Sequence, residues 1–182
     1  KSSKELTLSA KNFIIATGSS SMERPGITVD EKQIVTSTGA LSLPTIPKTM
    51  LVIGGGYIGL EMGSVWSRLG TKVTVVEKLD RIVPTMDGEI AAEFMKSLEK
   101  QGLEFKLSHK VVATKSGSKD VEVTMESEKD KKQIKDKFNV VLMSIGRKPN
   151  TEELNLEKIG VKLNDQKAIE VDQQFKTSVD GI

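Results

Sequence analysis

The clearest pattern of apolar and polar residues in the chain is a strand–helix–strand unit in its first half. Met50–Ile53 is a short apolar run that predicts a buried strand, and Tyr57–Leu69 has the spacing of an amphipathic helix. Gly70 is placed to cap the end of that helix, and the β-branched run Thr71–Val76 predicts a second strand. Together these segments predict a βαβ unit, in which a helix joins two parallel strands.

Shorter signals precede this unit. Glu5–Leu8 and the continuous apolar run Asn12–Thr17 predict strands, and the second of them is expected to be buried on both faces. Thr36–Leu43 predicts a short helix with a Ser or Thr cap, which Pro44 and Pro47 end.

After the unit the pattern changes from helical to alternating. Asp87–Lys100 predicts a second amphipathic helix, and Leu103–Leu107 predicts a third strand. From Lys110 to Val141 the period changes to two, and the segments VVATK, VEVTMES and FNVVLMSIG predict antiparallel strands. The charged run Ser127–Lys137 has mixed signs and predicts a solvated turn. The expected fold class is α/β, with a parallel sheet and an antiparallel β-meander.

Composition excludes several kinds of function. The chain has 182 residues and a net charge of +2, so no basic surface favours nucleic acid, and no apolar run of about 18 residues predicts a membrane-spanning helix. Cysteine is absent, which excludes disulfides, thiolate metal sites and a dithiol redox centre within these residues, and no metal site is expected. His109 is the only histidine, and its place before a strand predicts a surface residue.

Candidate chemistry lies in the turn of the βαβ unit. Gly54, Gly56 and Gly59 form a G-x-G-x-x-G pattern that follows one predicted strand and opens the predicted helix. Gly54 permits a tight turn, Gly56 lets a pyrophosphate approach the backbone, and Gly59 lets the helix pack against the strand. N–H groups at the start of the helix face the phosphates. The turn predicts a dinucleotide site, and a close-packed turn without ligand is the alternative.

An acidic residue ends the second strand of the unit. Glu77 follows the run VTVV, where a carboxylate accepts hydrogen bonds from the adenosine ribose hydroxyls. The same carboxylate repels a 2′-phosphate, so NAD(H) is expected as the cofactor rather than NADP(H).

A longer resemblance rests on TSTGALSLPTIPKTMLVIGGGYIGLEMGSVWSRLGTKVTVVE together with IVPTMDGEI, SLEKQGLEFKL, NFIIATGS and SIGRKPNTEELNLEKIGV. These segments resemble the flavin-dependent disulfide reductases of the pyridine nucleotide-disulfide oxidoreductase family, and most of all the dihydrolipoamide dehydrogenases among them. The resemblance covers the whole chain. It implies a Rossmann-like NAD-binding domain flanked by strands of an FAD-binding domain.

The resemblance also implies a role for each matching position. Thr17, Gly18 and Ser19 match a turn that touches FAD. The positions that match the NAD site are Gly54, Gly55, Gly56, Tyr57, Ile58, Gly59, Leu60, Glu61, Glu77, Val111 and Gly146. Among them Tyr57 and Glu61 fall beside the flavin–nicotinamide junction, Val111 near the adenosine, and Gly146 near the nicotinamide. No catalytic residue is assigned within the chain.

Several features of the family are missing from this sequence. The FAD-binding glycine fingerprint, the redox-active cysteine pair, the downstream GD motif and the dimerisation domain with its His–Glu pair are not found in it. The chain is therefore expected to be an internal segment of a longer protein. Residues 31–147 would form the NAD-binding domain, and residues 1–30 and 148–182 would be two pieces of the flavin domain that pair with each other. Met22 and Phe175 are expected to be exposed.

The resemblance implies a function for the longer protein. It would oxidise protein-bound dihydrolipoamide to lipoamide and reduce NAD+ through FAD and a redox disulfide, as a homodimer whose partners are the lipoyl domains of 2-oxoacid dehydrogenase complexes. Its location would be the mitochondrial matrix or a bacterial cytoplasm. A reductase of the glutathione or mercuric type and a non-catalytic dinucleotide-binding module are the alternatives. The chain alone is expected to lack dehydrogenase activity.

Overall fold

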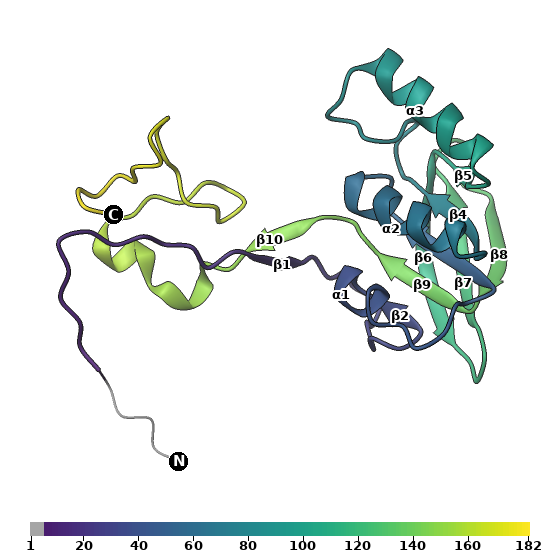
Figure 1. The fold of residues 1–182 in the computed structure, drawn as a ribbon, viewed down its shortest axis with the longest axis horizontal. Coiled ribbons are helices and arrows are strands. Elements are labelled where there is room, and N and C mark those ends of the chain that lie inside the picture. The colour runs from purple at the N-terminus through teal and green to yellow at the C-terminus, as the bar shows by residue number, and fades with distance from the viewer. Residues whose placement is uncertain (1–5) are drawn as a thin grey trace. The chain divides into compact units, whose positions relative to one another are not determined.

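The computed structural model describes residues 6–182 and divides the chain into two compact units (Figure 1). The larger unit is Ser21–Gly146, and the smaller unit combines the chain up to Ser20 with Arg147–Ile182. The first domain boundary was expected after residue 30. Residues 21–30 instead join the larger unit, because Ile27 is buried in its core and the Asp30 carboxylate accepts hydrogen bonds from three amides that lead into its first strand.

The larger unit contains most of the regular structure. Its elements are β2 (Ile34–Val35), α1 (Ser37–Ala40), β3 (Thr49–Ile53), α2 (Tyr57–Arg68), β4 (Lys72–Val76), α3 (Gly88–Lys100), β5 (Glu104–Lys106), β6 (His109–Ser116), β7 (Val121–Ser127), β8 (Gln133–Phe138) and β9 (Val140–Met143). The predicted βαβ unit is β3–α2–β4. The Thr or Ser cap expected for the short first helix is Thr36, whose hydroxyl accepts from the amide of Thr38.

A five-stranded sheet in the order β2-β9-β3-β4-β5 forms the centre of this unit, and every neighbouring pair is parallel. Successive side chains of β3 point to opposite faces. Met50 and Val52 pack in a cluster with buried residues of α2 and α3, whereas Leu51 and Ile53 pack with buried residues of β6–β8. Because both faces are covered, β3 is a continuous apolar run rather than an alternating one.

The second sheet is antiparallel, with the order β6-β7-β8. Along β7 the residues alternate between buried and half-buried, as expected of a sheet with one face toward the core. The predicted α/β class, a parallel sheet with an antiparallel meander, is therefore confirmed.

Two assignments after β6 were wrong. The segment FNVVLMSIG was expected to be the third antiparallel strand, but Val140–Met143 lies parallel between β2 and β3 with all four residues buried. The charged run Ser127–Lys137, expected to be a turn, connects two strands only up to residue 132. Its second half, together with Phe138, is β8, the third antiparallel strand. Five of its six residues are exposed, because β8 is an edge strand whose charges face solvent.

The smaller unit has little regular structure. It contains the pairing of β1 (Ser19–Ser21) with β10 (Arg147–Pro149) and two short 3₁₀ helices, η1 (Glu152–Leu154) and η2 (Leu156–Ile159). Its two segments are joined by hydrogen bonds from the Phe13 amide to the Gly181 carbonyl, 2.8 Å, and from the Thr17 hydroxyl to the Asn150 carbonyl, 2.7 Å. The predicted pairing of the two flanking segments is confirmed.

The strands predicted at the start of the chain do not form. Residues 12–17 make no strand and Ile14 is 92% exposed, because no other described strand lies beside this run to complete a sheet. Of the predicted strand at residues 5–8, residue 5 lies outside the described residues, and residues 6–8 adopt no strand. Met22 and Phe175 are exposed as expected.

Candidate dinucleotide-binding site

The glycine turn lies at the carboxyl end of β3, the central strand of the parallel sheet. From β3 the chain adds β4 and β5 on one side, while β9 and β2 lie on the other side. In open parallel sheets, ligands bind outside the carboxyl ends of the strands where the direction of winding reverses. The topology therefore brings the turn to the position where this fold class binds its ligands.

Gly54 makes the sharp exit from β3. Its φ angle is +108°, and a Cβ atom there would lie 2.5 Å from the carbonyl oxygen of Ser144. The amide of Gly54 donates to the carbonyl of Val76, 2.8 Å away, which fixes the turn to the end of β4. Only glycine fits both this backbone conformation and the close approach of the neighbouring strand.

Gly59 brings α2 against β3. A Cβ atom on Gly59 would lie 2.4 Å from the Gly54 carbonyl oxygen and 2.9 Å from Val52 Cγ1. The next residue, Leu60, is fully buried in the cluster between the sheet and the helices. These contacts on the buried side of α2 hold the start of the helix against the glycine turn.

Gly56 differs from its neighbours because the space above it is open. A Cβ atom there would meet nothing within 4 Å, and its φ angle of −79° is ordinary. Gly56 is the N-cap of α2 and provides no side-chain hydrogen bond, whereas Asp87 caps α3 with its carboxylate. Since the first N–H groups of a helix have no partner within it, those of α2 remain available to a phosphate. The first turn of α2 holds no acidic residue to compete with one.

Glu77, at the end of β4, is fixed from several directions. Its carboxylate accepts hydrogen bonds from the amide of Gly55, 2.7 Å, and from the amide of Leu79, 2.8 Å. Its backbone is bonded to the Lys106 carbonyl and to the His109 amide. Each carboxylate oxygen has a second lone pair, so Glu77 can hold the turn and still accept a bond from a ligand hydroxyl.

A cavity of about 230 Å³ adjoins the turn and Glu77. Val111, which the resemblance places near the adenosine, is fully buried and lines it. The cavity is completed by backbone and side chains from several separate segments, namely Arg24, Ile53, Gly54, Val76, Lys78, His109, Lys110 and Ile145. Arg24 was not expected at the site, because it comes from a loop with no motif of its own. Ile145 was not expected either, although it precedes Gly146 in the segment SIGR.

The remaining residues predicted for the nucleotide lie on α2 and at the end of the unit. Tyr57 is 68% exposed in the first turn, and Glu61 is exposed one turn later on the same side of the helix. Ile58 is half-buried between them. Gly146 follows β9 with a φ angle of +131°, and its carbonyl accepts from the amide of Met22 at 3.0 Å. The turn, α2 and Glu77 are thus brought together, while the roles at the nicotinamide end stay predictions.

Comparison with known proteins gives the family. The family model described as pyridine nucleotide-disulphide oxidoreductase matches residues 1–182. The chain belongs to this family.

Members of the pyridine nucleotide-disulphide oxidoreductase family resemble the chain in sequence and in structure. It is 53% identical over 172 residues to a mitochondrial dihydrolipoyl dehydrogenase of Pisum sativum and 52% identical to a leghemoglobin reductase of Glycine max. These matches cover 94% of the chain and 34% and 33% of the relatives, so the chain spans about a third of their length. The HOCl-induced flavoprotein disulfide reductase RclA of Escherichia coli is 29% identical, with a TM-score of 0.80 over 94% of the chain and 38% of RclA.

The residues of this family member that were assigned to FAD lie in the smaller unit. Gly18 has a φ angle of +71°, and the carbonyls of Thr17 and Gly18 both accept from Asn150, through its side chain and its amide. Ser19 accepts from Arg147 Nε at 2.7 Å. The turn is therefore fixed to residues 147–150, which belong to the same unit. An apolar groove of about 490 Å³ lies in the same unit, between residues 13–17 and the two 3₁₀ helices.

His109 is not the surface residue that was expected. It is half-buried at the start of β6, its Nδ1 lies 2.7 Å from the carbonyl oxygen of Leu107, and it lines the cavity beside Glu77. The expectation failed because position within a strand sets which face a side chain occupies, and the sequence did not fix the register of β6.

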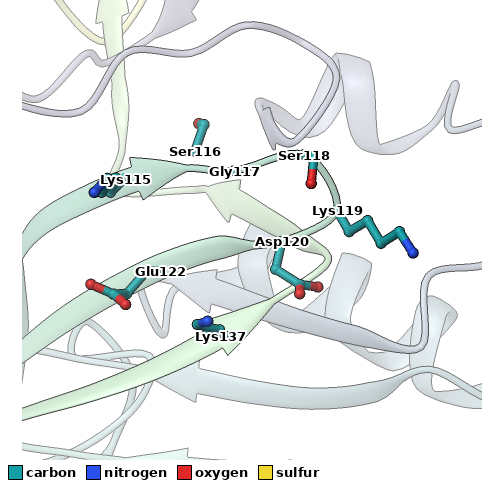
Figure 2. Close-up of a pocket in the computed structure, with 8 residues that line it drawn as sticks. All are labelled: Lys115, Ser116, Gly117, Ser118, Lys119, Asp120, Glu122 and Lys137. Atoms are coloured by element: carbon teal, nitrogen blue, oxygen red, sulfur yellow. The ribbon is translucent and has the colours of Figure 1, made fainter.

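Another pocket lies at the turn between β6 and β7, away from the glycine turn (Figure 2). It is shallow, has mixed charges and is lined by Lys115, Ser116, Gly117, Ser118, Lys119, Asp120, Glu122 and Lys137. Figure 2 shows the side chains of Lys115 and Lys119 extending in different directions, so they do not converge on one ligand. Across residues 6–182, metal-ligand side chains form no group of three, and no helix could span a membrane.

Proposed function

We propose that the larger unit binds NAD(H) and is the nucleotide-binding part of a flavoprotein dihydrolipoyl dehydrogenase. The observation that carries this proposal is the open backbone at Gly56 next to the Glu77 carboxylate. The open backbone fits a pyrophosphate, and the carboxylate fits a ribose with free hydroxyls. A turn that served packing alone would need small residues at Gly54 and Gly59 but not at Gly56.

Each group of the site has a part in holding the nucleotide. The amides at the start of α2 donate to the pyrophosphate, and the positive end of the helix dipole favours its charge. Glu77 accepts from the ribose hydroxyls, and the apolar wall at Val76 and Val111 covers the adenosine. Tyr57 and Glu61 lie further along the same side of the helix, toward the nicotinamide. Such fixed contacts hold the nicotinamide where a hydride can reach it.

The smaller unit would contribute to the flavin site through Thr17, Gly18 and Ser19. Bound FAD supplies the electron carrier between a dithiol and NAD+. Since the chain contains no cysteine, the redox disulfide must come from other residues of the protein, and the chain alone should show no dehydrogenase activity.

The substrate would be protein-bound dihydrolipoamide on the lipoyl domains of 2-oxoacid dehydrogenase complexes. The protein would act as a homodimer in the mitochondrial matrix, and the name of the pea relative supports a mitochondrial location.

A different flavin disulfide reductase is the second candidate, because RclA shares the fold at a TM-score of 0.80. Identity favours the first candidate, at 53% to the pea dihydrolipoyl dehydrogenase against 29% to RclA. Glu77 also argues against a reductase of the glutathione or mercuric type, because those enzymes mostly use NADPH and a carboxylate repels its 2′-phosphate.

Replacing Gly56 by alanine tests the proposal. The fold should be unaffected, because the new Cβ has free space and the φ angle is ordinary. NADH affinity should fall about tenfold or more, since the methyl group occupies the approach of the pyrophosphate and about 1.4 kcal/mol suffices for that loss. Titration of the chain with NADH, followed by nicotinamide fluorescence or calorimetry, measures the change.

Gly88→Ala is the matched control for this experiment. Gly88 is the first residue of α3, and its Cβ would lie 3.6 Å from Arg81 Nη1, an ordinary contact. It should leave NADH affinity unchanged. Equal affinities for the Gly56→Ala variant and the unmodified chain would show that the turn does not hold the pyrophosphate.

A further inference from the structure

His109 and Val111 share one face of β6. Alternate residues of a strand point to the same side, and Val111 is fully buried on the side that meets the parallel sheet. Both residues line the cavity next to Glu77, and the His109 amide donates to the Glu77 carbonyl at 3.0 Å. The imidazole therefore has a fixed place beside the residue proposed to bind the ribose.

The hydrogen bond of His109 defines which nitrogen remains for a ligand. Nδ1 lies 2.7 Å from the Leu107 carbonyl oxygen, which can only accept, so Nδ1 carries a proton. In the neutral ring Nε2 then has a lone pair, and in the charged ring it has a proton to donate. Among the hydrogen bonds of residues 6–182, none reaches Nε2.

Charged side chains of both signs line the cavity beside His109. Glu77 is the carboxylate that lines it, and Arg24, Lys78 and Lys110 are the cations. The Lys110 ammonium forms ion pairs with Glu126 at 3.1 Å and Glu128 at 3.2 Å, and these two carboxylates raise the pKa of Lys110. Lys110 thus stays charged but paired, whereas the charge of an imidazole changes between pH 5 and 8.

We propose that His109 sets how strongly the site discriminates against a 2′-phosphate. This inference rests on the proposed function, because it assumes that the ribose lies at Glu77. With a neutral imidazole, the Glu77 carboxylate repels the 2′-phosphate of NADP(H), and only the cations Arg24, Lys78 and Lys110 of the cavity offset that repulsion. With a charged imidazole, Nε2–H offers the phosphate a charge-assisted hydrogen bond and offsets part of that repulsion. NAD(H) has no charge at this position, so its binding changes much less.

Affinities of NADH and NADPH at pH 8.0 and pH 6.0 test this inference. The preference of the unmodified chain for NADH over NADPH should be about tenfold smaller at pH 6.0, a change of about 1.4 kcal/mol. His109→Asn is the key variant, because its side-chain amide can still donate to Leu107 but carries no charge. The 2′-phosphate of NADPH gains a proton near pH 6 whichever protein it binds. The difference in pH dependence between the unmodified chain and His109→Asn therefore isolates the effect of the imidazole charge.

A second variant and a spectroscopic readout complete the test. His109→Lys should bind NADPH at pH 8.0 better than the unmodified chain does, because its charge is permanent in this range. Since His109 is the only histidine, its NMR signal is unambiguous, and NADP+ at neutral pH should move it toward the protonated position further than NAD+ does.

The outcomes separate this inference from the proposed function. A preference that changes more with pH in the unmodified chain than in His109→Asn supports it. If NADH binds but both proteins show the same pH dependence, His109 has no such role and the proposed function stands. If NADH does not bind the unmodified chain at either pH, both are overturned.

Discussion

Replacing Gly54 by alanine should lower the free energy of unfolding of the larger unit by about 3 kcal/mol or more. The φ angle of +108° is strained for any residue with a Cβ, which costs about 1–3 kcal/mol. The Cβ would also lie 2.5 Å from the Ser144 carbonyl oxygen, and overpacking of this kind costs about 1–3 kcal/mol again. The obstacle is the backbone of the segment after β9, which cannot rotate away. Urea-induced unfolding, followed by the fluorescence of the only tryptophan, Trp66 in the core, measures the loss.

Gly56→Ala is the control for stability, since it makes the same chemical change in open space. It should change the free energy of unfolding by less than about 0.5 kcal/mol. The two glycines are thus expected to have opposite effects, Gly54 on folding and Gly56 on binding. A Gly54→Ala variant as stable as the unmodified chain would contradict the geometry described for the turn.

Replacing Glu77 by arginine should reverse the nucleotide preference. NADH affinity should fall about a hundredfold, because the site loses a carboxylate that accepts from the ribose, and a loss of about 2–5 kcal/mol is usual for a removed charged partner. NADPH affinity should rise, since a guanidinium pairs with a 2′-phosphate through two hydrogen bonds. Calorimetric titration of the variant with both nucleotides measures the two changes.

Glu99→Arg makes the same change of charge at an exposed position of α3, away from the turn. It should leave both affinities unchanged, which separates the local role of Glu77 from an effect of net charge. Because Glu77 also accepts from the Gly55 and Leu79 amides, the titrations must be made where the variant is folded. A Glu77→Arg variant that still prefers NADH would show that the ribose lies elsewhere.

The parts of the site that could be predicted from the sequence are those whose cause is local. The tight turn at Gly54, the helix start at Gly56 and the acidic strand end at Glu77 are close in the chain, and their spacing alone indicates one βαβ unit. The close approach of Gly59 to β3 follows from the same spacing.

The parts that could not be predicted depend on contacts distant in sequence. Val140–Met143 has the composition of any buried strand, and only its pairing between β2 and β3 decides that it is parallel. Asn12–Thr17 has a strand pattern, yet the described chain supplies no strand to pair with it. The burial of His109 follows from the register of β6, which no local motif fixes. Arg24 reaches the cavity from a loop whose course is set by the core around Ile27.

Backbone amide NMR with added NADH tests the central claim most directly, because it locates the bound nucleotide on the unmodified chain. The largest shifts should occur at the amides of Gly55–Gly59, with further shifts at Glu77, His109 and Val111. Shifts centred on the β6–β7 turn at residues 115–120, or no shifts at saturating NADH, would contradict the claim that this glycine turn is the nucleotide site.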